Sequence, residues 1–206
     1  MINFNKLELK NRKVYIEMAA SHSGLPASII EKDLWVCWTL ERLFNLKGIG
    51  SHLIFKGGTT LSKVYSVIDR FSEDIDISID RKELGFTGDK DPEQAPSAKK
   101  QQKLIEELAV SCKLFVQDRL HAILRDSIAV SIMDDTNWSL TIDENDPDGQ
   151  TILFHYPTIE NSYSGYIKPS VKIEIGARSD HWPAHQYLLK PYLHEYLPEK
   201  LNPDST

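Results

Sequence analysis

Two aspartates separated by one residue stand in a segment that is otherwise rich in isoleucine. Asp74 and Asp76 alternate there with Ile75, Ile77 and Ile79. Strict alternation of polar and apolar residues predicts a half-buried β-strand, in which residues two apart face the same way. Both carboxylates are therefore expected on one face of the strand, close to each other.

Neighbouring carboxylates repel each other, so this pair needs an explanation. The repulsion between two unit charges 4 Å apart is about 1 kcal/mol in water and about 4 kcal/mol at an effective dielectric of 20. A hard divalent cation such as Mg²⁺ would offset it by binding both carboxylates. A shared proton would also offset it, and two solvated acids at a sheet edge are a third interpretation. The aspartates alone leave all three open.

The residues before this strand have the composition of an anion-binding turn. Gly57 and Gly58 let the backbone approach a ligand closely, because no Cβ blocks the way. A helix is expected over 59–69, and the free N–H groups at its start attract phosphate. Lys63 adds a positive charge one turn later. An ordinary tight turn is the alternative, since the Walker A spacing is absent. With the aspartates, the turn predicts an active site that transfers a phosphate-bearing group with a metal.

A third acid stands in the apolar segment 171–175. Glu174 and Lys172 face one way there, opposite to three aliphatic side chains. A glutamate inside an apolar strand is costly unless it is paired or bound to a metal. An ion pair with Lys172 or Arg178 is one interpretation. Once the two aspartates are accepted as a site, we favour Glu174 as their third carboxylate.

The remaining patterns predict an α+β or mixed α/β domain with flanking helices on a mixed sheet. A single domain is expected over 1–206, with a helical part over 1–50, a catalytic core over 51–178 and a tail over 179–206. Helices are expected over 11–22, 26–45 and 98–124, strands over 52–55, 73–79, 138–142, 151–156 and 170–176, and a mobile loop over 81–98. Trp35 and Trp38 are expected in the core, and Cys37 and Cys112 as reduced thiols.

Charge and hydropathy narrow the class of protein. The net charge is −6, which argues against general affinity for nucleic acid. Lysine and arginine outnumber acids by ten to six over 1–70, whereas acids outnumber them by eighteen to nine over 71–150, so an RNA partner needs a local basic stripe. No apolar run is long enough to cross a bilayer, and the first residues lack the core of a signal peptide. A cytoplasmic protein without membrane contact is expected.

The combined pattern resembles a known family. The segments KGGTTLSKVY and RFSEDIDISI, with the later strand VKIEIGAR, are similar to those of the AbiEii-type nucleotidyltransferases, whose fold is related to DNA polymerase β. The helix around 30–33 resembles the segment upstream of these motifs. The resemblance implies a toxin of a type IV toxin–antitoxin or phage-abortive system, with a cognate antitoxin as partner. It also implies that an NMP is moved from an NTP to the 3′ end of tRNA with Mg²⁺ or Mn²⁺.

The resemblance also implies roles for individual residues. Asp74, Asp76 and Glu174 would be the catalytic and metal-binding carboxylates. The residues that would bind the nucleotide are Gly57, Gly58, Thr59, Lys63, Arg70, Ser72 and Lys172. The family tends to be longer, with a helical C-terminal half, so the tail is expected to lead into that half. Two alternatives stay open, namely a nucleotidyltransferase of small molecules such as antibiotics, and a non-catalytic nucleotide-binding module.

Overall fold

A computed structural model gives the fold, and it describes residues 4, 7–56, 74–132, 138–159, 168–178 and 189–197. The helices are α1 (Leu9–Ser23), α2 (Ala27–Phe44), α4 (Ala98–Leu114) and α5 (His121–Ala129), with a π-helical turn, η6 (Phe115–Leu120), joining the last two. The strands are β1 (Leu53–Lys56), β2 (Asp74–Ile79), β3 (Ser139–Ile142), β4 (Thr151–His155) and β5 (Ser170–Gly176). Short 3₁₀ turns are η2 (Gly50–His52), η3 (Arg81–Leu84), η4 (Gly88–Lys90), η5 (Pro92–Gln94) and η7 (Tyr192–Tyr196).

The five strands form one mixed sheet in the order β1-β2-β5-β4-β3. Strand β2 pairs with β5 in parallel, and the three other pairs are antiparallel. The expected α+β class with a mixed sheet and flanking helices is therefore confirmed. Because β2 and β5 are neighbours at the centre of the sheet, residues far apart in the sequence come together there.

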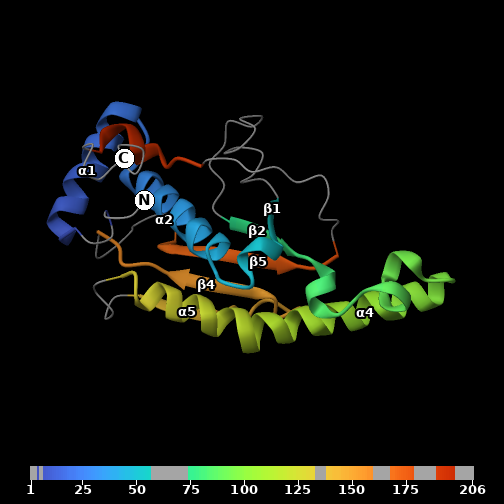
Figure 1. Cartoon of the computed structure of the whole chain (residues 1–206). Coiled ribbons are helices and arrows are strands. Elements are labelled where there is room, and N and C mark those ends of the chain that lie inside the picture. Colours follow the sequence, from blue (N-terminus) through green and yellow to red (C-terminus); the bar gives the residue numbers. More distant parts are fainter. Residues whose placement is uncertain are drawn as a thin grey trace.

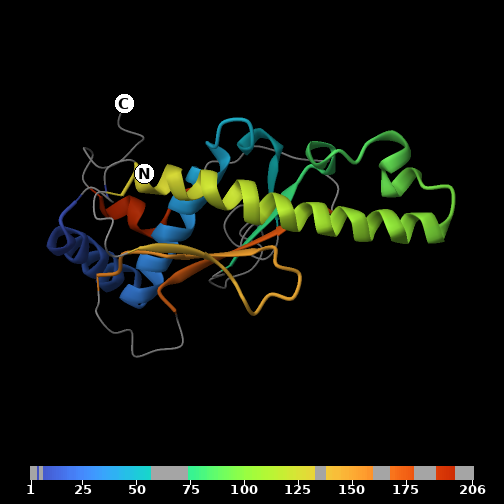
Figure 2. The ribbon, with the colours of Figure 1, turned by 90° about the horizontal axis from the view of Figure 1, so that it is seen from below.

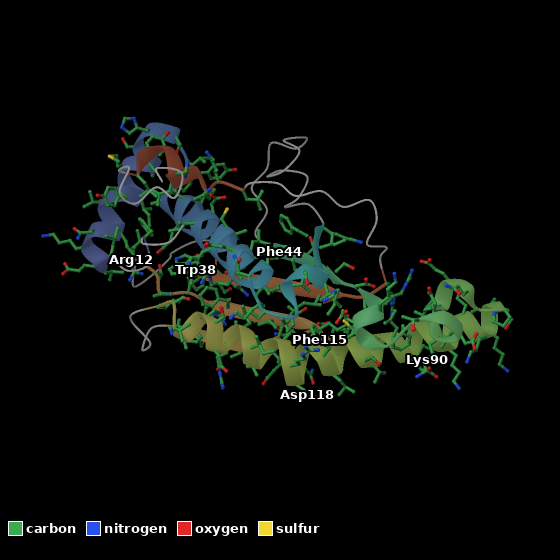
Figure 3. The ribbon with its side chains drawn as sticks, viewed as in Figure 1. Arg12, Trp38, Phe44, Lys90, Phe115 and Asp118 are labelled. Atoms are coloured by element: carbon green, nitrogen blue, oxygen red, sulfur yellow. The ribbon has the colours of Figure 1, made fainter. Side chains whose placement is uncertain are left out.

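One face of the sheet is apolar and carries the main core. Ile75, Ile173 and Phe154 belong to it, and they pack with side chains of α2, α4, η6 and α5. The segments α4, η6 and α5 form one long helix that runs along the sheet (Figures 1 and 2). Figure 3 shows Phe115 between this helix and the sheet, whereas Asp118 lies on the outer side of the helix. The opposite face of β2 and β5 is thus left to polar side chains.

The aromatic side chains of α2 anchor it to the apolar face. Trp35 stacks on Tyr156 with ring centroids 5.5 Å apart, and Trp38 stacks on Phe154 at 5.7 Å. Both tryptophans are buried, so the expectation of a core role is confirmed. Cys37 and Cys112 are both buried and carry reduced thiols, as expected.

Two buried carboxylates of α2 hold the later part of the chain. Glu31 accepts hydrogen bonds from the backbone N–H of Ile159, at 2.8 Å, and from the hydroxyl of Thr158, at 3.0 Å. Asp33 accepts one from the backbone N–H of Tyr192, at 2.7 Å. The segment around 30–33 therefore ties two distant pieces of chain to α2.

Some expectations differ from the observed elements. Helix α2 begins at Ala27, with Pro26 as its N-cap residue. The long helix continues past residue 124 to Ala129 through η6. The segment 81–98, expected as a loop, contains three 3₁₀ turns, and Arg81 pairs there with Asp91 and Glu93. The helix expected over 59–69 lies outside the described residues, and the division into parts at residues 50 and 178 stays a prediction. Within the described segments, no helix is long and apolar enough to cross a membrane.

Candidate active site

Strand β2 presents its aspartates on the face opposite the core. Asp74 is exposed and Asp76 half-buried, whereas Ile75, Ile77 and Ile79 are buried. The alternation seen in the sequence thus decides which face of the strand is buried. Because the isoleucines face the core, the aspartates that alternate with them must point to the opposite face.

Strand β5 brings its polar residues directly beside those of β2. In the parallel register Asp76 is the partner of Glu174, and Asp74 is the partner of Lys172. Lys56 of β1 is the partner of Asp76 on the other side. A row of polar side chains therefore crosses the sheet, with Asp76 and Glu174 at its centre. The structure brings the three predicted carboxylates together, while their catalytic role stays a prediction.

The electrostatics of Asp76 show how close these acids are. Its pKa is raised above 3.8, first by burial and then by the charges of Glu174 and Asp74 and a hydrogen bond with Glu174. The ammonium of Lys172 opposes this effect. The ionised form of Asp76 is therefore disfavoured by its acidic neighbours as well as by burial, which is the repulsion that the sequence pattern predicts.

Lys172 is the positive partner of this cluster. Its ammonium forms an ion pair with a carboxylate oxygen of Glu174. The pKa of Lys172 is raised chiefly by that bond, against burial, and the charges of Asp74 and Asp143 raise it further. The ion pair that the sequence offered as an alternative for Glu174 is thus present. Glu174 is therefore paired with Lys172 and, at the same time, lies beside Asp76.

A cavity of about 360 Å³ opens beside Glu174, on the side of β4. Its walls are the polar residues of the 143–151 segment together with two side chains of β5: Asp143, Asn145, Asp146, Pro147, Asp148, Gln150, Thr151, Lys172 and Glu174. Four of these residues are acids and one is a lysine, so the cavity favours positively charged groups and hydrogen-bond donors. The composition of the 143–149 segment predicts a solvated acidic turn, and no sequence signal places it beside Glu174.

Long-range hydrogen bonds hold the cavity wall in place. The side chain of Gln150 donates to the carbonyl of Ala109 on α4, at 3.0 Å, and the side chain of Gln117 donates to the carbonyl of Gly149, at 3.1 Å. Burial acts to raise the pKa of Asp146, but hydrogen bonds from Thr151 and from nearby backbone N–H groups lower it overall. Asp146 therefore stays ionised within the wall.

The chemistry of the donor set at the centre of the sheet suits a hard divalent cation, although the present geometry of the described residues does not form a three-ligand site. Carboxylate oxygens are the ligands that Mg²⁺ and Mn²⁺ prefer. The pKa of Asp76 is raised first by burial and then by its acidic neighbours, both of which a bound cation would offset. Across the described residues, no three His, Cys, Asp or Glu side chains are arranged to hold a metal. The ion pair of Lys172 engages Glu174 in this arrangement.

The other predicted nucleotide contacts lie outside the described residues. They are Gly57, Gly58, Thr59, Lys63, Arg70 and Ser72. This segment follows Lys56 at the end of β1 and returns to the sheet at Asp74, the start of β2. In the chain it therefore connects β1 to β2, whereas the cavity lies on the β4 side of Glu174.

Comparison with known proteins adds an independent finding. The model of the family described as nucleotidyl transferase AbiEii toxin, type IV TA system, matches residues 38–203. No curated protein and no solved structure matches the chain.

Proposed function

This chain belongs to the AbiEii nucleotidyl transferase toxin family of type IV toxin–antitoxin systems, and on this premise we propose its reaction. The protein transfers a nucleoside monophosphate from an NTP to an acceptor hydroxyl, with Mg²⁺ or Mn²⁺ as cofactor. The acceptor is the 3′ end of tRNA, and an antitoxin restrains the activity. The observation that carries the proposal is the pairing of Asp76 with Glu174 across the parallel strands β2 and β5.

The reaction is an in-line displacement at the α-phosphate. The acceptor oxygen forms a bond to that phosphorus, the bond to the β-phosphate oxygen breaks, and pyrophosphate leaves. Asp74, Asp76 and Glu174 would hold the divalent cations, which lower the pKa of the acceptor hydroxyl and offset charge on the departing phosphates when bound. Glu174 accepts the proton of the hydroxyl. The predicted glycine turn at 57–58 receives the triphosphate through its backbone N–H groups.

The sheet order supports separate approaches for the two substrates. The predicted phosphate turn belongs to the connection between β1 and β2 in the chain, and the cavity lies on the β4 side of Glu174. A triphosphate would be repelled by the acidic wall of the cavity. We therefore place the triphosphate away from the cavity, on the β1 side, and only the terminal hydroxyl of the tRNA next to Glu174, with the phosphates of the tRNA outside the cavity.

The test is transfer of label from α-³²P-labelled NTPs to total tRNA in the presence of Mg²⁺. The wild-type protein should label the RNA. Asp76→Asn should reduce labelling at least a hundredfold, because it removes a charge from the centre of the donor set. Asp118→Asn is the matched control, since Asp118 lies on the outer side of the long helix. Labelling by Asp76→Asn at the wild-type rate would refute the proposal.

The acidic cavity favours a second candidate function. Its wall suits a cationic small molecule better than a polyanionic RNA, so an acceptor such as an aminoglycoside is the alternative. Aminoglycosides offered in place of tRNA in the same assay distinguish the two. Labelled RNA alone supports the tRNA reaction, and a labelled aminoglycoside alone supports the alternative.

A further inference from the structure

Lys172 occupies an unusual place among the acids of the candidate site. It stands two residues before Glu174 on the same face of β5, and its register partner on β2 is Asp74. Its ammonium pairs with Glu174, and the charges of Asp74 and Asp143 act on it as well. The ammonium of Lys172 therefore serves as a cation for the described carboxylates of the site.

This ion pair is weak enough to be exchanged. The side chains of Lys172 and Glu174 are 37% and 43% exposed, so water screens their attraction. A divalent cation carries twice the charge of an ammonium and can contact several carboxylates at once. When such a cation binds Glu174, it repels the ammonium of Lys172 at short range.

The cavity offers the displaced ammonium a new position. Lys172, Glu174 and Asp143 all line this space of about 360 Å³. Asp143 lies at the start of the cavity wall, and its charge already acts on Lys172. Rotation of the flexible lysine side chain toward Asp143 keeps its charge compensated while freeing Glu174.

We propose that Lys172 is a positioning residue, a resident cation that holds Glu174 until a divalent cation binds and then turns to Asp143. This inference rests on the proposed function, because it assumes that Glu174 is a ligand of that cation. It explains why the described acids approach one another without forming a ready-made metal site. Lys172 thereby sets the affinity of the site for divalent cations.

We expect opposite effects on Mn²⁺ binding from replacing Lys172 and from replacing Asp143. Lys172→Met removes the competing cation and should tighten Mn²⁺ binding roughly three- to tenfold. Asp143→Asn removes the position to which the ammonium moves and should weaken Mn²⁺ binding about two- to fourfold. In the Lys172→Met background, Asp143→Asn should lose most of this effect, since no ammonium remains to be displaced.

Direct measurement of free Mn²⁺ by electron paramagnetic resonance, without nucleotide, gives these affinities independently of catalysis. Asp148→Asn is the matched control, because Asp148 lines the same cavity but is not among the charges that act on Lys172. Lys172→Arg keeps a cation and should bind Mn²⁺ like the wild type. Thermal unfolding of each variant confirms that it is folded.

The possible results separate this inference from the proposed function. If Mn²⁺ binding depends on Asp76 and is unchanged or weaker in Lys172→Met, the role assigned to Lys172 is wrong while the metal site stands. If neither the wild type nor Lys172→Met binds Mn²⁺ in a manner that depends on Asp76, both the inference and the metal-dependent function are wrong. Tighter binding in Lys172→Met with loss of the Asp143 effect supports the inference.

Discussion

Replacing Asp76 by asparagine should make the protein more stable while it abolishes activity. Asparagine has nearly the same shape as aspartate but carries no charge. The pKa of Asp76 is raised by burial, by Glu174 and by Asp74, so the ionised form is disfavoured in the folded protein. At neutral pH the wild-type chain therefore folds with an unfavourable charge at the centre of its sheet, and the variant does not.

The spacing of the strands sets the size of this effect. Adjacent strands are about 4.8 Å apart, and two unit charges at that distance repel by about 1 kcal/mol in water and about 3.5 kcal/mol at an effective dielectric of 20. Asp76 is only half-buried, and Lys172 offsets part of the repulsion. We therefore expect Asp76→Asn to raise the free energy of unfolding by about 1–2 kcal/mol, which is a Tm increase of about 2–8 °C for a domain of this size.

The dependence on pH identifies the cause. A raised pKa means that the folded state binds the proton more tightly than the unfolded chain does. The wild type therefore loses stability as the pH rises from the unfolded value of 3.8 through the raised folded value. Below this window both proteins are neutral at position 76, and the difference should vanish.

Thermal unfolding of the wild type, Asp76→Asn and Asp118→Asn between pH 3 and 8, without divalent cations, measures this difference. Asp118 is exposed on the outer side of the long helix, so its variant should follow the wild type at every pH. A Tm of Asp76→Asn at pH 7 that equals or falls below the wild-type Tm would refute the electrostatic reasoning.

Two further predictions concern the core. Burial raises the pKa of the Cys112 thiol to about 12, against the charge of Arg178, so a thiol reagent at pH 8 should leave it unmodified in the folded protein and modify it in urea; rapid modification of the native protein would contradict this. Glu31→Ala removes the acceptor of the Ile159 N–H group and should lower the free energy of unfolding by about 1–3 kcal/mol in urea titrations. Glu17→Ala, at an exposed position on α1, should change it little, and equal effects of the two would contradict the anchoring role of Glu31.

Sequence patterns predicted the local structure of the site better than its surroundings. Alternation of isoleucine with polar residues was enough to place Asp74 and Asp76 on one face of β2, because only one face of that strand can be buried. The neighbouring position of β5 was expected because the two aspartates call for a third acid on an adjacent strand, whereas periodicity carries no information on strand order. The register of Asp76 with Glu174 depends on backbone pairing between segments a hundred residues apart in the chain.

The cavity wall shows what local patterns cannot predict. Its aspartates and Gly149 indicate a turn between β3 and β4, and by composition alone such a turn is expected to be solvated. Its position beside Glu174 is fixed by Gln150 and Gln117, which bond to backbone carbonyls across the gap between the wall and the long helix. Nothing in the composition of the turn identifies those partners.

The most direct test of the central claim is a crystal structure with Mn²⁺ and a non-hydrolysable NTP. We predict anomalous density for Mn²⁺ in contact with the carboxylates of both Asp76 and Glu174, with the triphosphate on the β1 side of the sheet. A bound nucleotide whose Mn²⁺ contacts neither Asp76 nor Glu174 would contradict it.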